Sequence, residues 1–234
     1  MSFLTLYKAD WKMTRRDPIL VYAITMVFVM MVLIRFFKGR IPSSLYFGPV
    51  IFSLLLIPMI FGMMPAFLML DEKEEKIVQA LHVVPISTFK FLTYRLLNGM
   101  IFTGIFTVLA PIILDMKGFS NNVWIMLMFL LVLEVPILAL FVINFANSRI
   151  QGLTVVKFIG WFLLLPIVIE FIVVARDLST EWTKFTAFLP TYWISKFYEE
   201  VLSGGEYAHY FRIGFVVHLI WILALGIIFK KKIL

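Results

Sequence analysis

The sequence predicts an all-α polytopic membrane protein, and three observations carry that prediction. The mean hydropathy is +0.99. Hydrophobic residues make up 62% of the chain and charged residues only 15%. Long apolar runs recur along the chain, each close to the roughly 20 residues that a helix needs to cross a bilayer. Only helices and closed barrels satisfy the backbone in lipid, and these runs are too continuously apolar for barrel strands.

Six apolar runs account for the predicted spans of what we expect to be a single transmembrane domain, residues 1–234. Four of the runs are uncharged, and two carry one acid each, Glu134 and Glu170. The first run is long enough to span and no small-residue cleavage site follows it, so we expect no cleavable signal peptide. The runs are 18–34, 45–70, 96–114, 123–148, 158–175 and 213–229.

The basic residues predict the orientation in the membrane. With the N-terminus in the cytoplasm, 13 of the 21 lysines and arginines fall on the cytoplasmic side and 8 fall outside. Because cytoplasmic segments are usually the more basic ones, we expect both termini to be cytoplasmic. The net charge of +7 is therefore a topology signal and does not indicate a nucleic-acid partner. The absence of cysteine excludes disulfides, thiolate metal sites and cysteine nucleophiles.

Two further segments are not expected to span. In residues 1–17, Leu4, Tyr7 and Trp11 share one helix face beside a basic face, which is typical of a helix among lipid headgroups. The outer segment 176–212 is rich in aromatic residues at helical spacing on either side of Pro190. We expect an interfacial N-terminal helix and two short re-entrant helices before span six. An interfacial aromatic belt is the alternative for the outer segment.

The most informative segment lies between spans two and three, at residues 71–95. Four acids and two lysines open it, and Ile77, Leu81 and Val84 then follow at the spacing of one apolar helix face. Pro85 ends that helix, and Ser87 is placed to cap the next one. A short amphipathic helix held between two spans is suited to receive force from a cytosolic motor. A solvated loop with a capped helix start is the alternative.

The order of these parts resembles the membrane subunit of an ABC-2-type exporter over essentially the whole chain. Residues 146–152 and the later Pro166 resemble that family's link between spans four and five. One departure is Tyr94-Arg95, where many members have a glycine–lysine pair. The residues that resemble the family's coupling helix are Glu74, Glu75, Lys76, Leu81, Pro85 and Ser87, and those that resemble its re-entrant turn are Pro190, Tyr192 and Trp193.

The resemblance implies a transport subunit of a bacterial plasma membrane, not an enzyme. Such permeases work with a separate ABC ATPase that binds ATP and Mg. Because this chain has no G-x-x-x-x-G-K-[ST] phosphate loop, we expect it to bind no cofactor itself. Six spans are half of what these exporters use, which implies a homodimer or a heterodimer with a second permease chain. The 25 Phe and 13 Met favour an amphipathic or hydrophobic cargo, such as a peptide, drug or lipid.

Ionisable residues inside apolar runs are candidates for the translocation path, and here they are Glu134, Glu170 and His218. Glu134 lies too deep to reach the headgroups, so we expect it to face the pathway or a dimer interface. A protonated glutamate that only supports packing is the alternative. An ion-coupled secondary transporter that uses Glu134 and Glu170 is a second interpretation of the chain, against which no inverted repeat with broken helices is evident.

An intramembrane protease is a third interpretation. Glu74-Glu75 resembles the double-glutamate motif of intramembrane prenyl-protein proteases, but Gln79 stands where the motif needs an arginine. His82 and His209 fall on opposite sides of the membrane in the predicted topology, so these histidines cannot complete a shared site.

Overall fold

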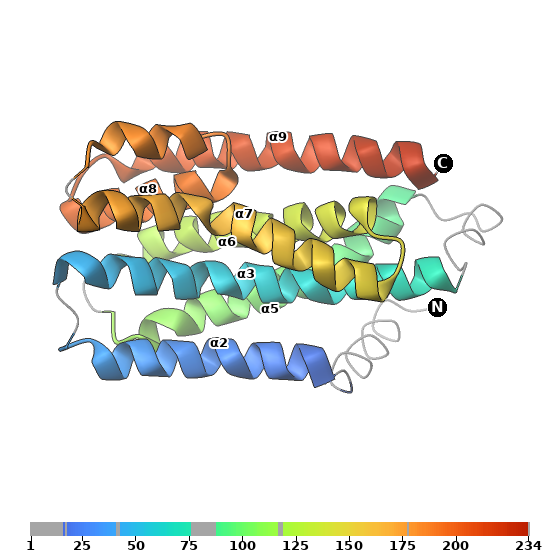
Figure 1. The fold of residues 1–234 in the computed structure, drawn as a ribbon, viewed down its shortest axis with the longest axis horizontal. Helices are drawn as coiled ribbons and strands as arrows, with labels where there is room; N and C mark the ends of the chain where they lie inside the picture. The colour runs from blue at the N-terminus through green and yellow to red at the C-terminus, as the bar shows by residue number, and fades with distance from the viewer. Residues whose placement is uncertain are drawn as a thin grey trace.

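The computed structural model describes residues 16, 18–40, 43–75, 88–116, 119–176 and 178–233. Within these ranges there are six long helices, two short ones and no strand. The long helices lie side by side with their axes roughly aligned, and they form an elongated bundle (Figure 1). They are α2 (Pro18–Phe37), α3 (Ser43–Glu74), α5 (Thr88–Ile113), α6 (Asn121–Phe145), α7 (Arg149–Ala175) and α9 (Tyr207–Ile233).

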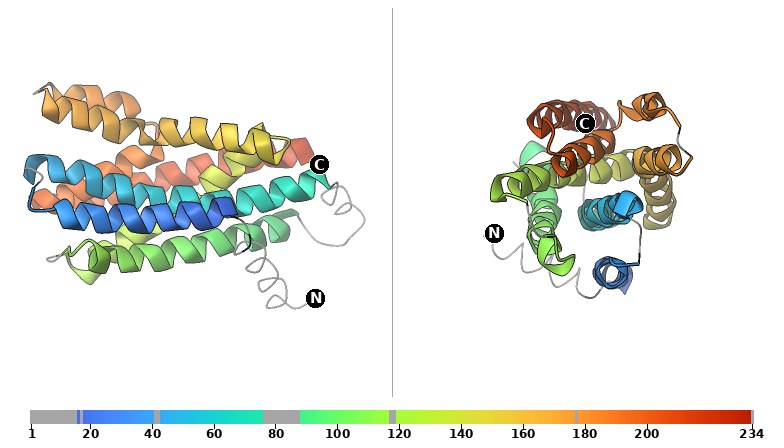
Figure 2. Two further views of the ribbon diagram at one scale, coloured as in Figure 1. Left: turned by 60° about the horizontal axis from the view of Figure 1, so that its bottom comes forward. Right: turned by 90° about the vertical axis from the view of Figure 1, so that its left-hand side faces the viewer.

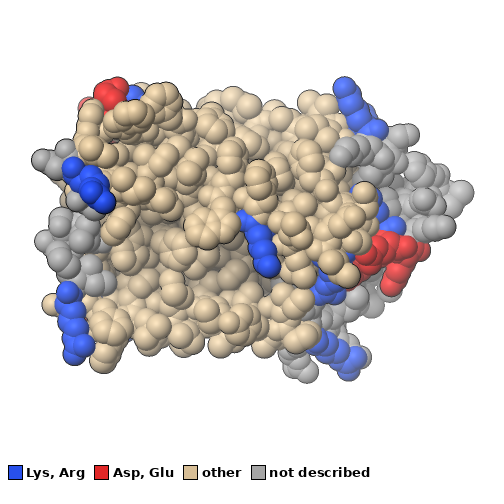
Figure 3. All heavy atoms as spheres, in the orientation of Figure 1, with Lys and Arg blue, Asp and Glu red and all other residues tan. Residues whose placement is uncertain are grey.

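Five of the described helices, α3, α5, α6, α7 and α9, are long and apolar enough to cross a membrane. In α2 the qualifying apolar stretch, Val21–Phe37, is shorter. Uncharged side chains cover the middle of the face shown in Figure 3, and charged ones gather towards its two ends, apart from one basic side chain in the middle. For the residues that the structure describes, the prediction of an all-helical chain with several apolar helices of spanning length is confirmed.

Most of the long helices extend beyond the apolar runs that predicted them, although α6 ends at Phe145, three residues before the end of its run. α3 continues to Glu74, α5 begins at Thr88, and α9 begins at Tyr207. α7 begins at Arg149, where the side chain of Ser148 caps its first turn. Charged and polar residues at the ends of membrane helices lower the local hydropathy without ending the helix, so apolar runs underestimate helix length.

α3 is the central helix of the bundle. In its most apolar window 78% of the residues are buried, against 22% in that of α9. It packs against α2, α5, α6, α7 and α8, and the end-on view of Figure 2 shows it between its neighbours. Pro49, Pro58 and Pro65 lie inside it, and each removes one backbone hydrogen bond. The most buried helix is thus also the one whose hydrogen-bond ladder is interrupted most often.

α5 packs tightly against α3 at Gly99. A Cβ atom at this position would overlap the carbonyl oxygen of Phe61 and lie only 3.0 Å from Cγ1 of Val135. Pro65 has no N–H to offer the Phe61 carbonyl four residues earlier. Glycine therefore lets the backbone of α5 pack directly against this interrupted turn of α3.

The outer segment forms two short helices, as predicted. η1 (Thr180–Thr186) is followed by α8 (Pro190–Ser203), and Gly204 ends α8 with a φ of 73°, a conformation that glycine adopts readily. The expectation of α-helical spacing in the first of the two is corrected, because η1 is a 3-10 helix. Pro190 disfavours helical backbone at the preceding residue, so η1 cannot continue into α8 and stays short. Short helices are often of the 3-10 type.

Two predicted elements lie almost entirely outside the described residues. One is the interfacial helix at 1–17. The other is the apolar part of the coupling segment, 76–87, which contains Lys76, Leu81, Pro85 and Ser87. Both stay predictions.

Candidate functional site

A glutamate is buried in the middle of the bundle. Glu134 of α6 is 2% exposed, and no described residue gives its carboxylate oxygens a hydrogen bond. Nε2 of His218, in α9, lies 3.4 Å from Oε1 of Glu134, and His218 is fully buried. Further along the same two helices, Asn144 donates to the carbonyl of Leu225 at 2.9 Å. The packing of α6 on α9 therefore brings two of the three candidate pathway residues together.

The hydrogen bond of His218 indicates where protons lie in this pair. Nδ1 of His218 lies 2.6 Å from the carbonyl oxygen of Gly214, one turn earlier in α9. Because a carbonyl can only accept, Nδ1 must carry a proton, and Nε2 of the neutral ring would then be an acceptor facing an acceptor carboxylate. Such an arrangement is repulsive in a low dielectric. We infer that the pair holds one further proton, on Nε2 or on Glu134, and is neutral overall.

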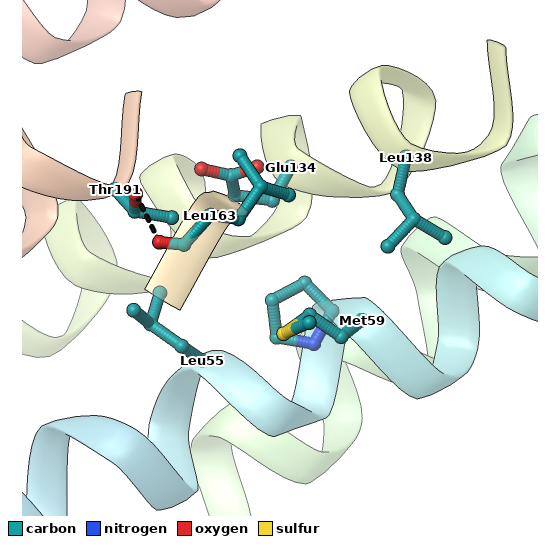
Figure 4. A pocket seen from close by; sticks show the side chains of 7 residues that line it. Leu55, Met59, Glu134, Leu138, Leu163 and Thr191 are labelled. Atoms are coloured by element: carbon teal, nitrogen blue, oxygen red, sulfur yellow. Dashed lines mark hydrogen bonds between the residues drawn. The ribbon is translucent and has the colours of Figure 1, made fainter. Parts of the chain in front are cut away.

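Glu134 also borders a narrow crevice that is too tight to hold a water molecule. Figure 4 shows its carboxylate beside Leu163 and Thr191, with Leu55 and Met59 of α3 across the crevice. Four helices contribute to the lining, which consists of Leu55, Pro58 and Met59 from α3, Glu134 and Leu138 from α6, Leu163 from α7 and Thr191 from α8.

The start of α8 is fixed to α7 beside this crevice. The hydroxyl of Thr191 donates to the carbonyl of Leu163 at 2.6 Å, in the turn where Pro166 disrupts the hydrogen bonding of α7. Two residues of the predicted re-entrant turn also lie at this start. Pro190 is the first residue of α8, and Trp193 donates from Nε1 to the carbonyl of Ala187 at 2.7 Å.

The predicted turn residues thus stabilise the entry into α8, while their neighbour Thr191 reaches the crevice. Tyr192, between Thr191 and Trp193, is 8% exposed. Nothing in the sequence distinguished Thr191 from the aromatic residues that follow it.

Glu170 lies apart from the other two candidate pathway residues. It does not line the crevice, and its Oε1 lies 3.1 Å from Nζ of Lys196 in α8. Lys196 also pairs with Glu199. Burial acts to lower the pKa of Lys196, but Glu170 and Glu199 outweigh it and raise the pKa above its usual value. Lys196 is therefore charged at neutral pH, and the network ties α7 to α8.

At the opposite end of the bundle, the acids that end α3 pair with two neighbouring helices. Glu72 pairs with Arg95 of α5. Oδ2 of Asp71 lies 3.2 Å from Nη1 of Arg149 at the start of α7, and Oε1 of Glu74 accepts from the backbone N–H of Arg149 at 3.0 Å. We call residues 71–74, with Arg95 and Arg149, the α3 junction.

Lys73, which belongs to the α3 junction, also connects the junction to α6. Its Nζ lies 2.9 Å from the carbonyl oxygen of Ala146 and 2.8 Å from Oδ1 of Asn147. The carbonyls at the end of α6 carry a partial negative charge that a lysine stabilises. Glu75 follows in an exposed turn. Arg95 was visible in the sequence only as a departure from the family pattern, and Arg149 only as part of a helix link.

A bundle of long apolar helices with ionisable residues buried at its centre is typical of membrane transport proteins. Residues 10–226 match the family described as "Fluoroquinolones export permease protein Rv2686c-like". Two relatives from Mycobacterium tuberculosis are each 30% identical over 178 residues, which is 74% of this chain and 68% of theirs. They are Fluoroquinolones export permease protein Rv2686c of strain H37Rv and Fluoroquinolones export permease protein MT2760 of strain CDC 1551.

The chain belongs to this family of export permeases. Its membership agrees with the resemblance to ABC-2-type permeases in the order of its parts, and it makes the chain a transport protein.

Proposed function

We propose that the chain is the permease subunit of an ATP-driven ABC exporter in a bacterial plasma membrane. In this proposal α2 is a sixth span, and η1 and α8 form the re-entrant element. Two permease chains, identical or different, would pair around the path, and a separate ATPase would bind ATP and Mg. The cargo is an amphipathic or hydrophobic molecule. Because the relatives are named for fluoroquinolone export, a drug is favoured over a peptide or a lipid.

The observation that carries the proposal is the α3 junction. Force that arrives through residues 76–87 enters α3 at its end, next to Glu74. The pair of Glu72 with Arg95 would pass it to α5, and the pair of Asp71 with Arg149 would pass it to α7. Both pairs are partly buried, so removing one partner would leave the other charge poorly solvated, and the pairs hold the helix ends together.

Movement of α3 would also reach the centre of the bundle. The same helix contributes Leu55, Pro58 and Met59 to the crevice beside Glu134. A displacement that begins at the α3 junction would therefore reshape the walls around the buried carboxylate. This link supports a permease in which an external motor drives the central site.

The source of energy tests the proposal. We expect an ATPase to co-purify with the chain from its native membrane, and export by inside-out vesicles to stop when ATP is replaced by a non-hydrolysable analogue. An uncoupler that collapses the proton gradient should leave the initial rate unchanged. The second candidate function, an ion-coupled secondary carrier, predicts the opposite pattern. It is favoured by the single proton that we infer Glu134 and His218 to share from their geometry.

The predicted topology can be tested by cysteine labelling, because the chain has no cysteine of its own. We expect Ser87→Cys to react with a membrane-impermeant maleimide only from the cytoplasm, and Ser203→Cys only from outside. Ser203 is exposed at the end of α8, at the end of the bundle opposite to the end of α3 (Figure 1). The unsubstituted chain serves as the unlabelled control. Labelling of both positions from the same side would contradict the six-span arrangement.

A further inference from the structure

The side chains that line the crevice beside Glu134 and His218 determine what it can bind. The walls opposite the carboxylate come from Leu55, Pro58 and Met59 of α3 and from Leu163 of α7. None of these side chains ionises, and Thr191 of α8 contributes only a hydroxyl. Glu134 is thus the one ionisable residue among those that line the crevice.

The other helices that pack near the pair bring no free charge to it. The buried polar residues of α5 are Asn98, Thr103 and Thr107, which are all uncharged. The buried lysine of α8, Lys196, pairs with Glu170 and Glu199. In α9, the ring of His218 itself is the ionisable group that faces Glu134.

We propose that this crevice binds the protonated amine group of an amphipathic cargo, and that the amine replaces the proton shared by Glu134 and His218. The amine enters as an ammonium ion, and the shared proton leaves to water. Glu134 is then a carboxylate paired with the ammonium, and His218 is neutral with its Nδ1 proton still on the carbonyl of Gly214. The site is neutral before and after the exchange, which avoids the high cost of a net charge inside the membrane.

The chemistry of the lining selects this ligand class. Apart from the proton shared with His218, the oxygens of Glu134 have no hydrogen-bond partner among the described residues, and an ammonium group supplies donors. An anion would face the acceptor carboxylate. The crevice is too tight to hold a water molecule as it stands, so its apolar walls must move apart for an ammonium group to reach Glu134. The rest of the cargo stays outside. The inference rests on the proposed function, since it names the chemical class of the cargo.

Two fluorescent probes test the site on the purified full chain in phosphatidylcholine nanodiscs. One is a dansyl-labelled hexylamine, whose amine is protonated throughout pH 6–8, and the other is its neutral N-acetyl derivative. We expect the amine to bind about tenfold or more tightly than the neutral probe. Since one proton leaves for each amine bound, the affinity for the amine should rise about tenfold per pH unit while the pair is protonated. The affinity for the neutral probe should stay constant.

Variants at Glu134 separate the site from general membrane partitioning. Glu134→Gln should lose both the preference for the amine and its pH dependence, while it still binds the neutral probe, which shows that the protein is folded. Glu134→Asp retains an ionisable group and should retain both properties. Equal binding of the two probes by the wild type, or binding of the amine that does not change with pH, would overturn the inference whether or not Glu134→Gln folds.

The assay contains no ATPase, so its failure is distinguishable from that of the proposed function. Intact amine binding by a chain whose export does not need ATP contradicts only the ATP-driven exporter. Equal binding of both probes by a chain that exports with ATP contradicts only the amine site.

Discussion

We expect Leu81→Asp to abolish ATP-dependent export, although the protein should still insert into the membrane. Leu81 falls on the apolar face predicted for the coupling helix, and we expect it to fill a pocket of the ATPase with Glu74 and Glu75 at the charged rim. Loss of a central apolar anchor costs about 2–4 kcal/mol, so binding of the ATPase should weaken by at least ~30-fold. The measurements are co-purification of the ATPase and ATP-driven transport in vesicles with matched amounts of the chain.

Gln79→Asp is the matched control for this change. At 100° per residue, Gln79 lies on the opposite side of the predicted helix from Leu81. The same substitution there should leave binding of the ATPase and transport close to the wild type. Normal transport by a well-expressed Leu81→Asp variant would show that this segment does not couple the chain to its motor.

The second large effect is expected at Glu134. Glu134→Leu should reduce export to background; it removes only one partner of a buried pair and leaves His218 behind, so some loss of folded yield is expected as well. Glu134→Gln should also lose export, but it should fold, since its amide can donate to Nε2 of the neutral His218. The measurements are monodisperse yield and transport rate per folded molecule.

The comparison of these two variants separates a role in transport from a role in packing. Glu181→Leu, at an exposed position in η1, is the control and should transport normally. Transport at the wild-type rate by Glu134→Leu would mean that the carboxylate serves only the packing of α6 against α9.

The existence and order of the long helices could be predicted from hydropathy, but their ends could not. Apolar runs follow the part of a helix that lies in hydrocarbon, whereas α3 continues to Glu74 and α7 begins at Arg149. The charged residues in these extensions find partners on neighbouring helices, as Asp71 does with Arg149. Hydropathy averages over one segment and contains no information about such partners. The 3-10 geometry of η1 could not be predicted for a related reason. Residue spacing does not show that Pro190 limits the length of η1.

Within the candidate site, the sequence indicated single residues and the packing determined the pairs. Glu134 and His218 stood out because each interrupts an apolar run, yet they are 84 positions apart and nothing in the periodicity of α6 or α9 specifies that they face each other. Glu170 stood out for the same reason and proved to pair with Lys196. Gly99 and Thr191 gave no signal, because small residues are common in apolar helices and only their neighbours show what they contact.

The backbone contact between α3 and α5 restricts how these two helices can move. Gly99 and Phe61 both lie near the middle of their helices, and the fit at this point has no room for a methyl group. Sliding of one helix along the other would bring larger side chains into the same gap, so rotation about the contact costs least. Rotation about a midpoint separates the helices at one membrane face while it brings them together at the other. In the proposed exporter, such a pivot between one glycine and one interrupted helical turn would let the two helices open to the two sides of the membrane in turn.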